Sequence, residues 1–195
     1  MRSYKEGNRK LAISNRVSAG IPGLDDAIDM LRLGDNVVWQ VQSLDEYLQV
    51  ARPFIRQAKA DGRRLIYFQF GRHDPLMSED EPSVAYKLDT SEGFEKFAAK
   101  IHDIIESEGD KAFYVFDCLS DLLDSWRSDM MVGNFFRITC PFLYLLDTVA
   151  YFALIRGAHT RDTIARIRET TQLLLDVYNI DNNLYVHPLK VWERY

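Results

Sequence analysis

Short apolar runs, separated by amphipathic segments, set the pattern of hydrophobic and polar positions along the chain. Five of these runs are rich in β-branched and aromatic residues, namely 36–41, 64–70, 84–88, 112–116 and 149–155. Continuous apolar runs of this kind are typical of strands that are covered on both faces. The pattern therefore predicts a buried sheet.

The segments between these runs have helical spacing. In residues 91–109, apolar residues recur on one helical face, Ser91 stands where an N-cap is expected, and Gly109 stands where the helix would end. Region 119–146 is also apolar, but an internal glycine and an internal proline interrupt it. This interruption predicts two or three short helices there.

Strands and helices alternate as far as the fifth run. This order predicts βαβ crossovers and a mostly parallel α/β sheet with helices on both faces. After a helix that begins near Thr160, segments 171–179 and 184–192 flank the turn-like residues 181–183, which predicts an antiparallel hairpin at one edge. Pro188 suits an edge strand because proline cannot donate to a central ladder.

The chain of 195 residues has no Pro-, Gly- or Ser-rich linker, so we predict a single domain, 1–195, with a polar N-terminal segment at 1–14. That segment lacks the apolar centre of a signal peptide, and no apolar run approaches the roughly 20 residues of a membrane span. The two cysteines, Cys118 and Cys140, lack the spacing of a zinc site or of a secreted disulfide framework. These features predict a cytoplasmic location.

The net charge of −5 argues against a non-specific nucleic-acid or anionic-membrane binder, since both require an excess of Lys and Arg, although it leaves room for a local basic patch. The four histidines show no metal-ligand spacing. We therefore expect no nucleic-acid partner, no membrane partner and no metal site.

Residues 16–25, followed by 33–35 and a strand, resemble the entry to the core of the KaiC and RecA-like ATPases. In that family a TG-x-x-GLD segment leads into the first strand. The matching residues here are Gly20, Gly23, Leu24 and Asp25, while Ala19 replaces the usual Thr. The resemblance covers about residues 14–192 and implies the three-layer fold of a RecA-like, P-loop NTPase-like domain.

The resemblance does not extend to the phosphate-binding loop of the family. The family places a phosphate-binding loop, G-x-x-x-x-G-K-[ST], after its first strand, but this chain has no Gly-Lys dipeptide and continues from Val41 with 42–47, QSLDEY. Ser43 and Glu46 have the spacing of a capping box, which would occupy the helix N-terminus that receives phosphate. Asp45 adds negative charge there, so a triphosphate is not expected to bind.

A second catalytic feature is absent. KaiC-like ATPases usually carry a pair of glutamates after the second strand, whereas Gly71 and Arg72 occupy the matching positions here. His73 and Asp74 are of the right type for proton transfer but have no evident substrate. We expect no catalytic residue for ATP hydrolysis and no ATP or magnesium cofactor.

Asp117 follows the apolar residues 113–116 and resembles the family's metal-associated Walker B aspartate. An acidic residue at the end of a buried strand is also a common helix cap, and we favour the cap over the metal ligand. Ser120, His159 and Arg161 are expected at the same carboxyl edge of the sheet. Open α/β sheets bind ligands at this edge, so these four residues are the candidate ligand-binding residues.

The arginines near this edge have a second interpretation, which we prefer. Arg161, Arg166 and Arg168 would then form a solvated helix face, balanced by Asp162 and Glu169.

Region 167–192 is similar to the N-terminal region of some phosphoenolpyruvate synthase and pyruvate phosphate dikinase-like proteins, ahead of their ATP-grasp domain. This likeness implies tethered ATP-grasp or phosphoenolpyruvate-binding domains and a parent phosphotransferase. We therefore predict a catalytically inactive KaiC-like module that acts through a protein partner or self-association. The alternative is a nucleotide- or anion-binding sensor or enzyme without a phosphate loop.

Overall fold

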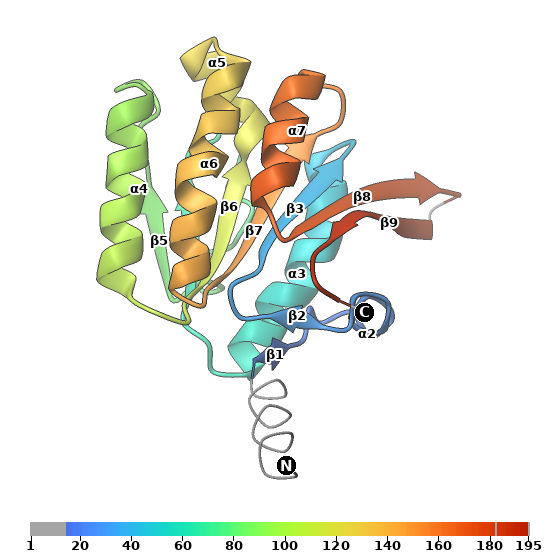
Figure 1. The fold of residues 1–195 in the computed structure, drawn as a ribbon. Coiled ribbons are helices and arrows are strands. Elements are labelled where there is room, and N and C mark those ends of the chain that lie inside the picture. Colours follow the sequence, from blue (N-terminus) through green and yellow to red (C-terminus); the bar gives the residue numbers. More distant parts are fainter. Residues whose placement is uncertain (1–14, 182, 195) are drawn as a thin grey trace, which may run out of the picture.

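The computed structural model describes residues 15–181 and 183–194. Its centre is a seven-stranded sheet in the order β5-β4-β6-β7-β3-β8-β9 (Figure 1). The strands are β3 (Asn36–Val41), β4 (Leu65–Gln69), β5 (Val84–Lys87), β6 (Phe113–Cys118), β7 (Val149–Ile155), β8 (Leu173–Ile180) and β9 (Asn183–Val191). All neighbours are parallel except β8 and β9, which form an antiparallel hairpin. The predicted mixed α/β class and C-terminal hairpin are confirmed.

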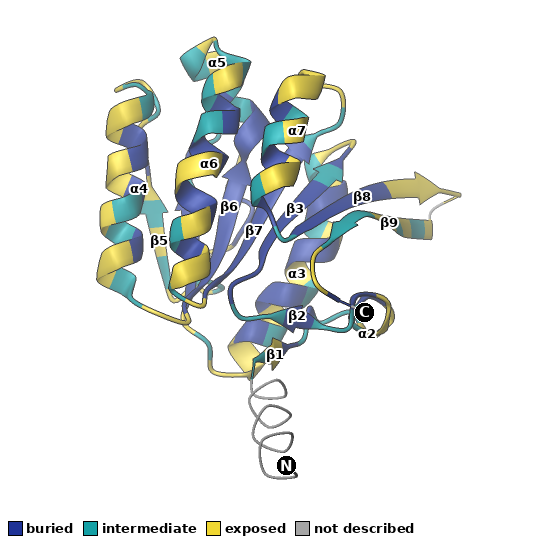
Figure 2. Cartoon of the chain, in the orientation of Figure 1, coloured by how far each residue is buried: buried dark blue, intermediate teal, exposed yellow. Residues whose placement is uncertain are grey.

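Helices cover the sheet on both faces. Helix α3 (Leu44–Ala60) packs on one face, while α4 (Phe94–Glu108), α6 (Asp129–Leu145) and α7 (Arg161–Thr170) lie side by side on the other (Figure 1). Alternate residues of a strand point to opposite faces, so Val37 belongs to the core beneath α3 and Val38 to the core beneath the other three helices. The sheet is buried and the outer helix faces are exposed (Figure 2).

Helix α6 differs from the prediction. Region 119–146 contains three helical elements, which agrees in number with the prediction: η1 (Leu119–Asp121), α5 (Leu122–Trp126) and α6. The expected interruption at Gly133 and Pro141 is wrong, because α6 runs unbroken through both residues. Pro141 lies on the exposed side of the helix. A Cβ at Gly133 would lie 3.2 Å from the Arg166 side chain, so glycine here permits close packing against α7. Tertiary packing therefore overrides the local breaking signals.

Helix α4 begins later than predicted. Ser91 is not its N-cap, because the Ser91 N–H donates to Asp89 at 2.8 Å in a preceding turn and Gly93 stands at the cap position. The predicted end at Gly109 is confirmed.

The entry segment has a structural explanation of its own. The Asp25 carboxylate accepts hydrogen bonds from Ser18 Oγ at 2.5 Å and from the Ala19 N–H at 2.7 Å, which fixes the turn ahead of α2 (Pro22–Ile28). Gly20 has φ of 75°, and a Cβ there would overlap with the Pro53 carbonyl of α3. Only glycine combines this conformation with so close an approach.

The amino-terminal edge of the sheet is tied to the end of the described chain. β2 (Leu31–Arg32), which pairs with β1 (Arg16–Val17), precedes the buried Asp35. The Arg194 guanidinium donates to Asp35 and to the Ile28 carbonyl, and its side chain is only 2% exposed. No helix of the described residues combines the length and apolar character needed to cross a membrane.

Candidate functional site

The carboxyl ends of the parallel strands meet at the upper edge of the sheet in Figure 1, where α3 also begins. Only Gln42 and Ser43 separate β3 from α3. Ser43 Oγ accepts from the Glu46 N–H at 3.4 Å, and the Glu46 carboxylate accepts from the Gln42 N–H at 2.7 Å. The predicted capping box is therefore correct on its serine side, whereas the returning bond goes to Gln42 instead of Ser43. Side chains of the helix itself occupy donors at this N-terminus.

Asp117 has a role that the sequence did not suggest. Strand β6 continues through Asp117 to Cys118, so the carboxylate reaches across to the end of β4. It accepts from the N–H groups of Phe70 at 2.7 Å and Gly71 at 2.8 Å and from the hydroxyl of Tyr67. The prediction that Asp117 caps a helix is therefore wrong, because its carboxylate binds the loop that follows β4.

The environment of Asp117 is closed. Its side chain is fully buried. Burial raises the pKa of Asp117, against the hydrogen bonds from Tyr67, Gly71 and Phe70, which lower it. A carboxylate that already accepts three bonds has little free capacity to ligate a cation.

His73 forms a charged contact beside this loop. Its Nε2 lies 3.3 Å from Asp121 Oδ2 and 4.0 Å from Asp117 Oδ1, and its Nδ1–H donates to the Asp74 carbonyl at 2.6 Å. The Asp121 contact raises the pKa of His73 to about 9, against burial, which lowers it. The raised pKa of His73 favours the charged imidazolium at neutral pH.

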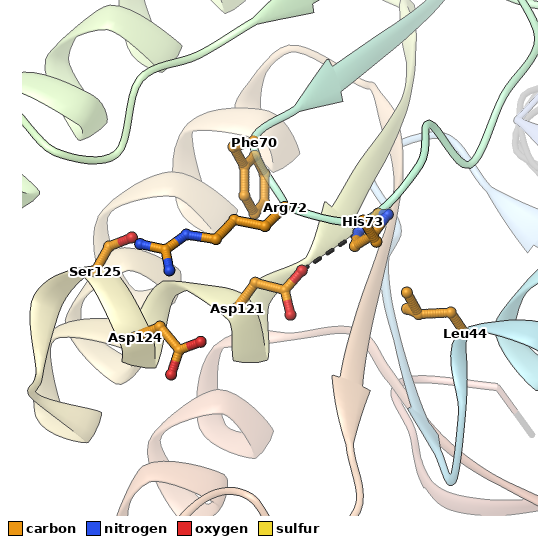
Figure 3. A pocket seen from close by; sticks show the side chains of 7 residues that line it. All are labelled: Leu44, Phe70, Arg72, His73, Asp121, Asp124 and Ser125. Atoms are coloured by element: carbon orange, nitrogen blue, oxygen red, sulfur yellow. Dashed lines mark ion pairs between the residues drawn. The ribbon is translucent and has the colours of Figure 1, made fainter.

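A small pocket opens next to this pair (Figure 3). His73 points at Asp121, while Arg72 extends toward Ser125 and Asp124. The remaining lining residues are Leu44 and Phe70. The pocket encloses about 150 Å³, whereas sites for drug-sized ligands enclose about 300–1,000 Å³. Its two cations and two carboxylates balance, so it offers no net positive charge to a polyphosphate.

A second group of residues forms a Ser-His-Asp chain. Ser120 Oγ lies 2.8 Å from His159 Nε2, and His159 Nδ1 lies 2.6 Å from Asp129 Oδ1. The order and the distances are those of a serine nucleophile, its base and the orienting acid. The structure thus brings together two of the predicted residues, Ser120 and His159, and adds Asp129, which the sequence analysis missed.

The surroundings of this chain limit its chemistry. Ser120 Oγ also accepts from the Ile155 N–H at 2.9 Å, and the His159 side chain has no exposed surface. Asp129 accepts further bonds from the N–H of Thr160 at 2.9 Å and from its hydroxyl at 2.5 Å. Ser120, His159 and Asp129 therefore all have hydrogen-bond partners, and together they connect the starts of α6 and α7 to the sheet.

These hydrogen bonds stabilise the charged form of Asp129. Burial acts to raise the pKa of Asp129, but hydrogen bonds from Thr160, His159 and Thr163 lower it to about 2. Three of the arginines near this edge engage separate partners, and the group does not form one anion site within the described residues. Arg156 pairs with Asp176 at 2.6 Å and stacks 4.2 Å over the ring of Tyr178.

The three arginines of α7 have other surroundings. Arg166 donates to Asn134 at 3.4 Å. Arg168 donates to the Leu189 carbonyl at 3.0 Å. Arg161 is exposed on α7 and forms no ion pair within the described ranges. Arg161 therefore does not join Ser120 and His159.

Metal and thiol chemistry find little support in the described part of the chain. There, no group of three or more His, Cys, Asp or Glu residues could hold an ion. Cys118 and Cys140 are buried free thiols, and burial raises the pKa of Cys118 to about 11. Such a thiol is a poor nucleophile.

No family model matches the chain, and no curated protein matches it significantly.

Proposed function

We propose that this chain is a catalytically inactive KaiC- and RecA-like domain that acts in the cytoplasm as a protein-interaction or regulatory module. The observation that carries the proposal is the acidic, capped N-terminus of α3, where Ser43 binds the Glu46 N–H and the Glu46 carboxylate binds the N–H of Gln42, just ahead of the helix. A helix N-terminus binds phosphate through free N–H groups and positive charge. Here a side chain satisfies one donor of the first turn, a second binds the N–H just ahead of the helix, and two carboxylates, those of Asp45 and Glu46, stand in the first turn.

Two further observations support it. Asp117, the counterpart of the family's metal-associated aspartate, is engaged by Phe70, Gly71 and Tyr67. The pocket beside His73 is small and balanced in charge.

The entry motif around Gly20 and Asp25, together with the mostly parallel sheet, supports the family assignment. The likeness of region 167–192 to phosphoenolpyruvate synthase-like proteins extends the proposal to tethered ATP-grasp or phosphoenolpyruvate-binding domains.

Thermal melting with magnesium-ATP tests the proposal. A ligand that binds the native state at 100 times its dissociation constant adds about 2.7 kcal/mol of stability, which is several degrees for a domain of this size. We expect no shift and no phosphate release. A saturable shift, together with hydrolysis that disappears in Asp117→Asn but persists in Asp124→Asn, would overturn the proposal.

A second candidate function is a sensor or hydrolase without a phosphate loop. The hydrogen-bonded series Ser120–His159–Asp129 favours it, although Asp117 and Arg161, the other two predicted ligand-binding residues, do not join this group. A fluorophosphonate probe tests it: Ser120 Oγ would bond to phosphorus, fluoride would leave, and His159 would take the hydroxyl proton. Labelling that Ser120→Ala abolishes and Ser125→Ala retains would support this candidate. Absence of labelling would exclude a reactive serine.

A further inference from the structure

A groove lies between helix α3 and strand β9 of the hairpin, which projects beyond the helices (Figure 1). The groove encloses about 630 Å³, whereas ligand sites enclose about 300–1,000 Å³. It shares no lining residue with the smaller pocket beside His73. The molecule therefore carries a second concave site, away from the candidate residues at the carboxyl edge of the sheet.

Two apolar walls form this groove. Leu48 and Pro53 of α3 line one side, and Leu184 and Val186 of β9 line the other. Residues of a strand alternate between its two faces, so Tyr185, between these two, points away from the groove. Leu184 and Val186 both keep part of their surface exposed. An apolar group that enters the groove therefore removes further apolar surface from water, which is favourable.

Pro53 leaves a hydrogen-bond acceptor at the groove. Helix α3 runs unbroken through Pro53, but proline has no N–H to donate to the carbonyl four residues earlier. The carbonyl of Gln49 therefore lacks its usual helical donor. Gln49 and Pro53 both line the groove, so this carbonyl can accept from an N–H of a bound group.

The charged lining residues stand at opposite ends of the groove. Arg52 and Arg56 lie one turn apart on the exposed side of α3, and Asp45 lies two turns before Arg52. At the rise of an α-helix, about 10–17 Å separates Asp45 from the two arginines. Arg52 also borders a pocket that Glu79 and Glu81 line. Neither arginine forms an ion pair within the described ranges.

We propose that this groove binds the C-terminal end of a partner protein, in extended form and with an apolar last residue. This inference rests on the proposed function, since it names the partner of the interaction module. Arg52 and Arg56 bind the terminal carboxylate, for which guanidinium groups are well suited. The Gln49 carbonyl accepts from a peptide N–H, and the last side chain packs between Leu48 and Leu184.

The opposite end of the groove selects a basic residue of the peptide. An extended chain spans about 3.3–3.6 Å per residue, so a lysine about three residues before the last one reaches Asp45. A fatty carboxylate would also suit the two arginines. It would leave Asp45 and the Gln49 carbonyl without partners, and therefore the peptide is the occupant that matches the whole lining.

Fluorescence anisotropy with the full chain tests the proposal. The probes are four fluorescein-labelled peptides, GSGKSA followed by Leu, Ile, Val or Phe, each with a free carboxylate. We expect at least one to bind saturably. Amidation of its end should weaken binding by roughly tenfold or more, because it removes the charge that the arginines bind. Replacement of the peptide lysine by glutamate should also weaken binding, because it places two carboxylates together at Asp45.

Matched variants of the chain test the groove itself. Arg56→Gln and Leu184→Asp should each weaken binding by roughly tenfold or more, since they remove a cation and place a charge in an apolar wall. The control for the first is Arg137→Gln, an exposed arginine of α6 on the other face of the sheet. The control for the second is Tyr185→Asp on the opposite face of β9. Circular dichroism melts must show that all four variants remain folded.

Three results would each overturn the inference. They are failure of all four peptides to bind, binding that amidation or Arg56→Gln leaves unchanged, and octanoate that displaces the best peptide with equal affinity. Melting with magnesium-ATP decides the proposed function separately. That function survives a failure of the peptides if ATP gives no shift, and it fails if ATP binds, whatever the peptides do.

Discussion

Asp129 Oδ1 lies 2.6 Å from His159 Nδ1, although Asp129 begins α6 and His159 follows β7, thirty residues later in the sequence. The same carboxylate binds the N–H and the hydroxyl of Thr160, the N-cap of α7. His159 is also hydrogen-bonded to Ser120, which follows β6. Asp129 therefore connects α6, α7 and the sheet.

Removing this carboxylate should destabilise the fold. In Asp129→Ala the buried His159 and the start of α7 lose charged hydrogen bonds, each of which contributes about 1.5–3 kcal/mol. We expect the free energy of unfolding, measured in urea, to fall by about 2–3 kcal/mol. Asp124→Ala removes an exposed carboxylate from α5, and it should change stability by less than about 0.5 kcal/mol.

The low pKa of Asp129 predicts that its contribution to stability depends on pH. The pKa of Asp129 is about 2 in the folded state, below its ordinary value of 3.8. Its contribution to stability is therefore complete above pH 3.8 and is lost as the pH falls toward 2. The stability difference between the native chain and Asp129→Ala should shrink over this interval. A constant difference between pH 5 and pH 2.5 would contradict the assigned hydrogen bonds.

The raised pKa of His73 predicts a pH dependence of stability in the opposite direction. Its pKa rises from 6.5 to about 9 in the folded state, first through Asp121. The stabilisation is complete below pH 6.5 and is lost as the pH rises through about 9. Urea midpoints should fall more between pH 6 and pH 9.5 in the native chain than in His73→Gln. Asp121→Asn should flatten the same slope, because it removes the partner carboxylate.

The elements that the sequence predicts best are those buried on both faces. The predicted bounds of β3 and β7 match the structure because continuous apolar runs mark such strands directly. The expected break at Gly133 and Pro141 does not occur in α6, because packing against the sheet and α7, which a local pattern does not contain, keeps both residues within one helix.

The candidate site was predicted only in part. Ser120 and His159 each follow a strand, so the carboxyl-edge rule identifies them. Asp129 lies in the first turn of α6, in a region where the sequence pattern gives no helix bounds, so the pattern does not place it beside His159. The role of Asp117 depends on the N–H groups of a neighbouring strand, and no sequence spacing indicates such a bond.

Gly71 should not tolerate a side chain. A Cβ at this position would overlap with the His73 imidazole and lie 2.6 Å from Asp121 Oδ2. Gly71→Ala must therefore separate the ion pair or move the loop, and overpacking of this kind costs about 1–3 kcal/mol. Gly23→Ala is the control, because Gly23 lies within α2 and an added Cβ meets nothing within 4 Å. We expect it to be neutral or slightly stabilising, since alanine suits a helix better.

Arg194 should matter far more than its place near the chain end suggests. Its guanidinium is the partner of Asp35, and both side chains are almost fully buried. Burial raises the pKa of Asp35, against Arg194, which lowers it, so Arg194→Met leaves a buried carboxyl group without its counter-charge. Breaking a buried pair in this way costs about 3–5 kcal/mol.

The surface pair Arg16–Asp29 supplies the control for Arg194. Its side chains are 38% and 46% exposed, and Arg16→Met should cost less than about 1 kcal/mol. Asp35→Asn combined with Arg194→Met should recover part of the stability, because the uncompensated charge is gone. If Arg194→Met and Arg16→Met instead lower the urea midpoint equally, the buried pair does not hold the end of the chain to the amino-terminal edge of the sheet.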